Sequence, residues 1–238
     1  MLVKTLFGLM LGFCCGIAVG STQVNSTCYG TTANGRLLNG VSLPDEGKNF
    51  ITYSDTAAAL GRTYVHSTVR NVILDAYQAL SQSLPKTQFK YGETGFKEGG
   101  RFRPHKTHQN GLSVDFMVPV KDKSGQPSIL PTHVFNKFGY AVEFDQTGRT
   151  DDLYIDFPAI AAHLRALHQT ATQRGIKIWR VIFDPKLQPY LWQTADGAYL
   201  RKHLTFSKRR SWVRHDEHYH VDFIIPCKPL SSYADDSQ

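Results

Sequence analysis

Cysteine is scarce in this chain, and no long apolar run follows the first twenty residues. Only 4 of the 238 residues are cysteine, which excludes a small scaffold built on many disulfides. The lack of a second long apolar run excludes a bundle of membrane helices. Acidic residues are the minority, with 20 Asp and Glu against 27 Lys and Arg. With 41% hydrophobic residues, the sequence predicts a soluble globular domain with a basic surface.

Residues 1–20 have the pattern of an export signal. Lys4 supplies a positive charge ahead of an apolar stretch, and residues 18–20 form a small-x-small tripeptide typical of a cleavage site. The stretch is short for a spanning helix, which needs about 20 apolar residues. We therefore expect a cleaved signal peptide at 1–20 and a mature domain at 21–238 that is not attached to a membrane.

Two cysteines remain after that cleavage, at opposite ends of the mature chain. They are Cys28 and Cys227. In an exported protein an isolated pair favours a disulfide, and two unrelated thiols are the alternative. A bond closing so long a loop would stabilise the domain by about 4–5 kcal/mol in the chain-entropy description.

Hydrophobic spacing predicts two long helices and a few strands. Apolar residues recur every third or fourth position over 64–84 and over 159–174, ahead of Pro85 and Gly175 respectively. Strands are expected at 112–118, 176–183 and 212–225, and a short helix at 186–193. Because helices and strands mix without regular βαβ alternation, we expect one α+β domain with a small, largely antiparallel sheet flanked by helices. The three tryptophans, Trp179, Trp192 and Trp212, are expected in its core.

Histidine is concentrated in two short windows. Five of the ten histidines are His105, His108, His215, His218 and His220. Residues two apart on a strand share a face, so His218 and His220 can point together. Asp115 lies on a strand of otherwise apolar pattern, where a buried carboxylate needs a cation.

Two histidines and one aspartate make a ligand set with an open fourth position. That is the pattern of catalytic zinc, which lowers the pKa of bound water and polarises a carbonyl group. The alternatives are surface histidines or a hydrogen-bonded structural cluster.

Two segments resemble the signature blocks of a known family. They read GGRFRPHKTHQNGLSVDF over 99–116 and SWVRHDEHYHV over 211–221, and weaker similarity runs from Cys28 to Pro226. Both are similar to the penicillin-insensitive murein endopeptidases, periplasmic members of the lysostaphin, D-Ala-D-Ala and hedgehog-like zinc peptidases. The resemblance implies a fold of that type and cleavage of peptide cross-links in peptidoglycan. It also implies one zinc ion held by His108, Asp115 and His220, with His215 and His218 as catalytic residues in the cleft.

Other residues have two readings. Arg101 is a candidate substrate contact, because a guanidinium group forms paired hydrogen bonds to a carboxylate or stabilises an oxyanion. The alternative is an ordinary surface arginine. His105 is a second candidate contact or an outer ligand, with a solvent-exposed loop histidine as the alternative. Ser113 stands where the family pattern has an acidic residue. Within 119–150 only His133 and Asp145 offer further metal ligands, so we expect a single metal.

Two other functions fit the same residues. A D,D-carboxypeptidase that trims stem peptides would use the same metal machinery, and a zinc-containing peptidoglycan-binding protein would keep the residues without catalysis. A nuclease is disfavoured because the sequence lacks the Asn/His grouping of the ββα-metal nucleases, so no nucleic-acid partner is expected. The sequence leaves the oligomeric state open.

Overall fold

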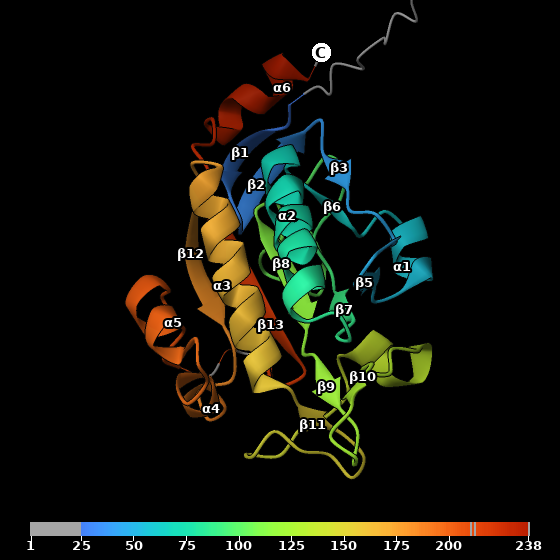
Figure 1. Cartoon of the computed structure of the whole chain (residues 1–238). Coiled ribbons are helices and arrows are strands. Elements are labelled where there is room, and N and C mark those ends of the chain that lie inside the picture. The colour runs from blue at the N-terminus through green and yellow to red at the C-terminus, as the bar shows by residue number, and fades with distance from the viewer. Residues whose placement is uncertain (1–24, 210, 212, 238) are drawn as a thin grey trace, which may run out of the picture.

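The computed structural model describes residues 25–209, 211 and 213–237 (Figure 1). The signal peptide expected at 1–20, as well as Trp212, lies outside the described residues, and both remain predictions. No helix in the described part of the chain combines the length and the apolar character needed to cross a membrane.

A six-stranded sheet forms the centre of the domain. Every neighbouring pair is antiparallel except β5 with β7, which is parallel. In spatial order the strands are β12 (Lys177–Ile182), β13 (His218–Ile224), β8 (Ser113–Met117), β7 (Phe89–Tyr91), β5 (Phe50–Thr52) and β4 (Glu46–Gly47). The prediction of a single α+β domain with a largely antiparallel sheet is therefore confirmed.

Two long helices cover one face of this sheet. They are α2 (Ser67–Ser83) and α3 (Phe157–Gln173), which pack side by side (Figure 1). The carboxylate of Asp156 accepts the backbone N–H group of Ala159 in the first turn of α3, and Gly175 takes a positive φ of 72° just after the helix. Both helices were predicted, but α2 begins later than expected because β6 (Tyr64–Val65) precedes it.

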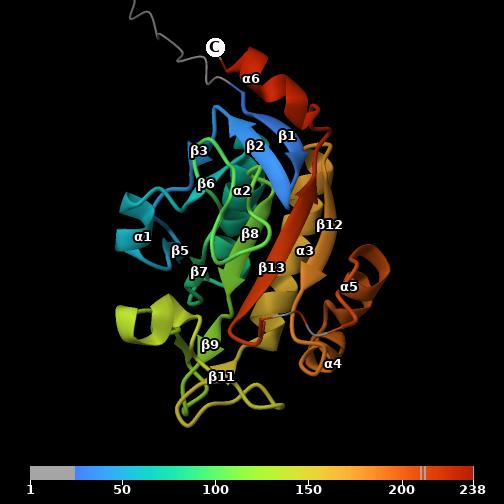
Figure 2. The ribbon, with the colours of Figure 1, turned by 180° about the vertical axis from the view of Figure 1, so that it is seen from behind.

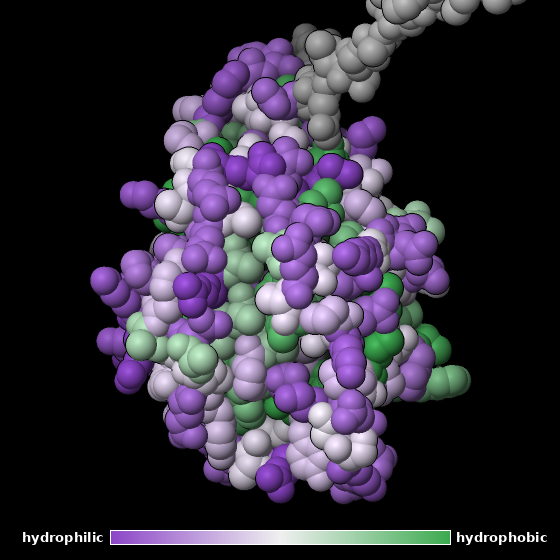
Figure 3. Space-filling model, viewed as in Figure 1, coloured by the Kyte–Doolittle hydropathy of each residue, from purple (hydrophilic) through white to green (hydrophobic). Residues whose placement is uncertain are grey.

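The opposite face of the sheet carries loops rather than helices. Figure 2 shows β8 and β13 in front of α2 and α3, with an irregular segment of the chain crossing before them. On the helix side the exposed surface is mostly hydrophilic, as the space-filling view shows (Figure 3). The free face of β8 and β13 is thus the one available for a site.

Shorter elements surround the sheet. Three further sheets are the hairpin of β1 (Thr27–Thr31) with β2 (Asn34–Leu38), the pair of β3 (Val41–Ser42) with β6, and the trio of β9 (Val120–Lys121), β10 (Pro127–Ser128) and β11 (Tyr154–Ile155). The short helices are α1 (Asp55–Ala59), α4 (Gln188–Trp192), α5 (Gly197–His203), α6 (Tyr233–Asp236) and the 3-10 turns η1 (Val134–Gly139) and η2 (Leu230–Ser232).

A disulfide joins the two ends of the described domain. Cys28 on β1 is bonded to Cys227, 199 positions later. Backbone hydrogen bonds support the junction, since Lys228 N–H donates to the carbonyl of Cys28 and Gly30 N–H donates to that of Lys228, each at 2.9 Å. The predicted pairing is confirmed.

Two local predictions are wrong. The strand expected at 212–225 begins only at His218, because residues 213–217 instead turn their polar groups into a pocket and onto neighbouring loops. Trp179 is 48% exposed rather than in the core; it lies at a β-bulge on the edge strand β12. Trp192 is partly buried against the core.

His66 caps α2 and should make the stability of the domain depend on pH. Its Nδ1 accepts a hydrogen bond from the backbone N–H of Thr68 at 3.1 Å, which requires a neutral imidazole. Burial lowers the pKa of His66 to about 4, although a backbone contact with Ser26 acts in the opposite direction. In the unfolded chain, the imidazole of His66 has its ordinary pKa of about 6.5. The contribution of neutral His66 to the free energy of unfolding is therefore complete above about pH 6.5. About 3 kcal/mol of this free energy is lost as the pH falls toward 4.

His66→Asn tests this dependence, because asparagine accepts the same capping bond without titrating. Denaturant unfolding is measured at pH 7.5 and pH 4.5 for both proteins. We expect the loss of unfolding free energy between these two pH values to be smaller in the variant by about 2–3 kcal/mol. Equal losses in the two proteins would contradict a titrating cap.

Candidate metal centre

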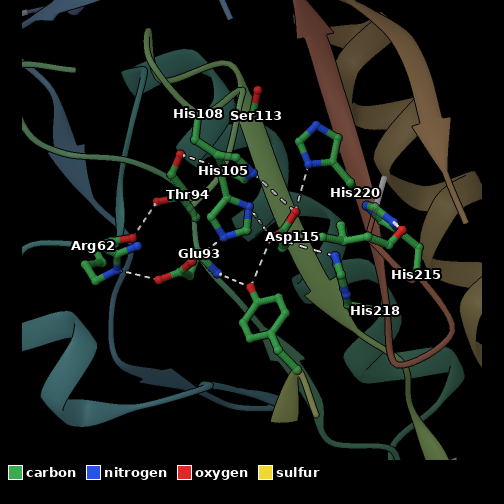
Figure 4. A network of polar contacts seen from close by, with 12 residues as sticks. Arg62, Glu93, Thr94, His105, His108, Ser113, Asp115, His215, His218 and His220 are labelled. Carbon is green, nitrogen blue, oxygen red and sulfur yellow. Dashed lines mark hydrogen bonds and ion pairs between the residues drawn. The ribbon is translucent and has the colours of Figure 1, made fainter. Parts of the chain in front are cut away.

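Asp115 lies in the middle of four histidines on the free face of the sheet (Figure 4). It comes from β8, directly opposite His220 on β13, and His218 lies two residues earlier on the same face. His105 and His108 come from the loop that precedes β8. Tyr219 points to the other face, where its ring packs against Phe116, so the predicted division of β13 is confirmed.

The two oxygens of Asp115 face different partners. Oδ1 accepts a hydrogen bond from His220 Nδ1 at 2.8 Å and lies 3.4 Å from His108 Nε2. Oδ2 accepts the hydroxyl of Tyr140 at 3.0 Å and lies 3.9 Å from both His105 Nδ1 and His218 Nε2. Burial alone would raise the pKa of Asp115, but the surrounding imidazoles outweigh burial and hold the pKa well below its usual range. The group is therefore a carboxylate.

His108 presents an unpaired nitrogen to this carboxylate. Its Nδ1 donates to the carbonyl of Thr94 at 3.0 Å, so Nε2 carries the lone pair. Burial lowers the pKa of His108, and Nε2 has no hydrogen-bond partner among the described residues. The lone pair of His108 Nε2 and the carboxylate of Asp115 are therefore buried side by side, and no described residue places a cation between them. A metal ion would bind to both groups. The residues present therefore fit a metal ion.

The two strand histidines are oriented by carboxylates behind them. Glu217 Oε1 accepts His218 Nδ1–H at 2.8 Å, which turns His218 Nε2 toward Asp115. Asp222 Oδ1 accepts His220 Nε2–H at 2.8 Å, which turns Nδ1 toward Asp115. Hydrogen bonds of this kind fix the tautomer and the direction of a metal-binding imidazole.

His220 is positively charged in this arrangement. Burial lowers its pKa, but Asp222 and Asp115 outweigh burial and raise the pKa to about 10. When a metal coordinates an imidazole nitrogen, the metal replaces the proton there. Nδ1 of His220 thus carries a proton at the position where a cation would bind.

Asp222 is itself held by two groups. Ser113 donates its hydroxyl to Asp222 Oδ1 at 2.5 Å, and Arg180 donates Nε–H to Oδ2 at 2.6 Å. Ser113 and Asp222 lie opposite each other in the β8–β13 register. Position 113, where the family pattern led us to expect an acidic residue, thus holds a hydroxyl that donates to a carboxylate of the neighbouring strand.

His105 belongs to the cluster itself. One ligand atom from each of His105, His108 and Asp115 lies within 4.8 Å of the others, so these three can hold a metal ion. The far nitrogen of His105, Nε2, is hydrogen-bonded to Glu93, which also pairs with Arg62. The sequence left His105 as a substrate contact, an outer ligand or an exposed loop histidine; the structure brings it among the candidate metal ligands, and its role stays a prediction.

The remaining predicted site residues lie at different distances from this cluster. His215 is buried beside His218, with ring centres 4.5 Å apart, and burial lowers its pKa to about 3. Arg101 is exposed and lines a separate hollow with Arg36 and Tyr233, so it does not join the histidines. The functional roles assigned to both remain predictions.

A pocket of about 530 Å³ opens beside the cluster. His105 and His218 line it together with Tyr140 and Glu217. Sequence reasoning missed Tyr140, Glu93, Glu217 and Asp222. The last two flank the histidine pattern within two residues and were within reach of the sequence, whereas Tyr140 and Glu93 carry no local signal.

Imidazoles gathered around one buried carboxylate, beside a pocket, define a centre that can hold a metal ion next to a substrate. Residues 28–235 match the family model of the penicillin-insensitive murein endopeptidases, and the chain belongs to this family. The resemblance seen in the two histidine segments is thereby confirmed. Membership makes the protein a peptidase of a family that acts on murein, the peptidoglycan of the cell wall. A search of curated proteins finds no match to the chain.

Asp222→Asn should weaken metal binding. The amide keeps the size of the side chain but removes the charge that orients His220 Nε2–H, and loss of such an outer partner costs about 10–100-fold in metal affinity. Affinity is measured by competition with a chromophoric chelator. Asp196→Asn, which removes a carboxylate paired with Arg165 at the surface, is the matched control and should bind metal like the wild type. Equal affinity in all three proteins would contradict the orienting role.

Proposed function

We propose that this protein is a zinc-dependent endopeptidase of the periplasm, which hydrolyses peptide cross-links between peptidoglycan stems with activated water. The main support for a metal-dependent reaction is the buried Nε2 atom of His108, which lies beside Asp115 without a hydrogen-bond partner among the described residues. His108, Asp115 and His220 are assigned as the zinc ligands, and His105 is an additional candidate because of its place in the cluster. A zinc ion held there would lower the pKa of a water molecule and would polarise the scissile carbonyl.

His218 is assigned as the proton-transfer group. Its Nδ1–H is tied to Glu217, which leaves Nε2 as a base that faces both Asp115 and the pocket. Burial lowers the pKa of His218 to about 4, so the imidazole is neutral at pH 7 and keeps the lone pair of Nε2. It takes a proton from the attacking water at Nε2 and then gives it to the departing amine.

Two neighbours position these groups. Tyr140 accepts the backbone N–H of Glu93 at 3.0 Å, which directs its own O–H group at Asp115. His215 packs on His218 and donates Nδ1–H to the carbonyl of Val213 at 3.1 Å. We assign His215 to the orientation of His218 or to a contact with the tetrahedral intermediate. Arg101 is assigned to a more distant part of the polymer, because it lies outside the pocket.

The assignment to the periplasm has two supports. The sequence of residues 1–20 has the pattern of a cleaved signal, and the Cys28–Cys227 disulfide is a bond that oxidising compartments maintain. Murein itself lies outside the cytoplasmic membrane, in agreement with both.

The function is tested on purified cross-linked muropeptides, digested with and without a chelator and analysed by mass spectrometry. We expect cross-linked dimers to become monomers, and we expect the chelator to stop the reaction until zinc is restored. Loss of terminal D-Ala with dimers intact would instead establish a D,D-carboxypeptidase. No change in either substrate, with binding to peptidoglycan retained, would establish a non-catalytic binding protein.

His218→Ala and His220→Ala should separate catalysis from metal binding. His218→Ala should keep about one zinc per chain, as a three-ligand site requires, while losing about 10²–10⁴-fold in turnover. His220→Ala should lose both zinc and activity, as should His108→Ala and Asp115→Ala. Metal is measured by elemental analysis beside muropeptide turnover. A His218→Ala protein without zinc, together with a His220→Ala protein that keeps it, would reverse the two roles.

A further inference from the structure

The turn that ends η1 has an unfavourable backbone where it borders the pocket. Lys137 and Phe138 adopt φ values of 51° and 56°, and Gly139 follows at 96°. Side chains of L residues crowd the backbone in this left-handed region, and glycine avoids the crowding. Only the third of the three residues is glycine, so the first two keep their side chains at a conformational cost.

The turn is held in this conformation by Asn136. Its Oδ1 accepts the backbone N–H groups of His133 and Gly139, each at 2.9 Å, and its Nδ2 donates to the carbonyl of Pro131 at 2.7 Å. The backbone N–H of Phe138 also donates to the carbonyl of His133 at 2.8 Å. Several bonds therefore over-determine the left-handed conformation, as is typical of strain retained at functional sites.

Both strained residues line the pocket that contains His105 and His218. The ring of Phe138 meets the edge of Tyr53, with ring centres 6.2 Å apart, and so has a packing role. Lys137 is exposed and forms no ion pair with any residue that the structure describes. The bonds of Asn136 thus hold the backbone of the turn, while the ammonium group of Lys137 has no ion-pair partner among the described residues.

The other cations near the pocket are already paired. Arg62 is bonded to Glu93. Arg214 pairs with Glu143 at 2.7 Å and with Asp216 at 3.1 Å. Within the described chain, Lys137 is therefore the pocket-lining ammonium or guanidinium group that is open to an anionic ligand. Because Glu93, Glu143 and Glu217 also line the pocket, an anionic group of a ligand has its favourable position at Lys137.

We propose that Lys137 binds a free carboxylate of the peptide substrate, and so selects peptides that carry one near the scissile bond. This inference rests on the proposed function, since it assumes that the pocket receives a peptide. It names the chemical group that the pocket recognises beyond the metal centre. The left-handed turn places residue 137 among the residues that line the pocket.

Lys137→Gly separates this role from a structural one. Glycine removes the ammonium group and the backbone strain together, so the Tm should stay the same or rise by up to about 2–4 °C. The KM for a carboxylate-bearing peptide should rise about 10-fold with kcat little changed, as for lost uniform binding. A lower Tm with unchanged KM would make Lys137 a structural residue and overturn the proposal.

A charge-only comparison uses Lys137→Gln beside Lys177→Gln. Lys177 is an exposed lysine on β12 that lines a different hollow, so its variant controls for the loss of one positive charge. The wild type and the two variants are each given two peptides. One peptide has a carboxylate beside the scissile bond, and the other has a primary amide at the same position. The wild type and Lys177→Gln should prefer the carboxylate about 10-fold, and Lys137→Gln should show no preference.

The same comparison is made for binding of the uncleaved monomeric peptide pair, measured by calorimetry. Preference for the carboxylate that survives in Lys137→Gln would overturn the proposal, even if cross-links are cleaved. If no protein cleaves a cross-link, the proposed endopeptidase function fails, and the calorimetric comparison still decides whether Lys137 recognises the carboxylate. The two failures are thus distinguishable.

Discussion

A single buried carboxylate organises the functional face of this domain. Asp115 is fully buried, and water cannot stabilise its charge, so the protein must do so. Hydrogen bonds from His220 and Tyr140 provide that environment, and the unpaired nitrogen of His108 lies beside the carboxylate, where a cation would join the two. These groups come from β13, from the segment after η1 and from the loop before β8. The placement of three distant parts of the chain thus depends on one negative charge.

The free-energy cost of burying the histidines is offset by hydrogen bonds to further polar residues behind them. Behind His220 lies Asp222, and behind Asp222 lie Ser113 and Arg180. Behind His218 lies Glu217, and behind His105 lies Glu93. Each imidazole therefore uses one nitrogen for orientation and directs the other at Asp115. Because a half-satisfied network costs more than an apolar core, the outer partners are needed as much as the histidines.

Much of the fold was accessible from the sequence because its signals are local. The two long helices carry complete periodic patterns, and the alternation around Asp115 and across His218 and His220 correctly gave the shared face. The disulfide followed from the cysteine count. The helix at 64–84 was extended too far because periodicity alone does not reveal the capping role of His66.

The outer partners were less accessible because they depend on tertiary contacts. Tyr140 reaches Asp115 across 25 positions, and no pattern around position 140 marks it. The strand expected from 212 begins at His218, and just before it the carboxylate of Asp216 accepts the backbone N–H of Phe144 in a distant loop. Trp179 looked like a core residue by type, but it lies at an edge bulge. Sequence patterns describe a strand's faces well and its neighbours poorly.

The register of β8 with β13 has a consequence for when the centre comes into being. Asp115 and His220 are 105 positions apart, and they meet only when these two strands pair. Contacts between such distant positions form late, since a long loop must close first. An unfolded or partly folded chain therefore contains the histidines but not the centre. A chain of this kind therefore acquires its candidate centre only on folding, so any hydrolysis at this centre must wait until the two strands pair.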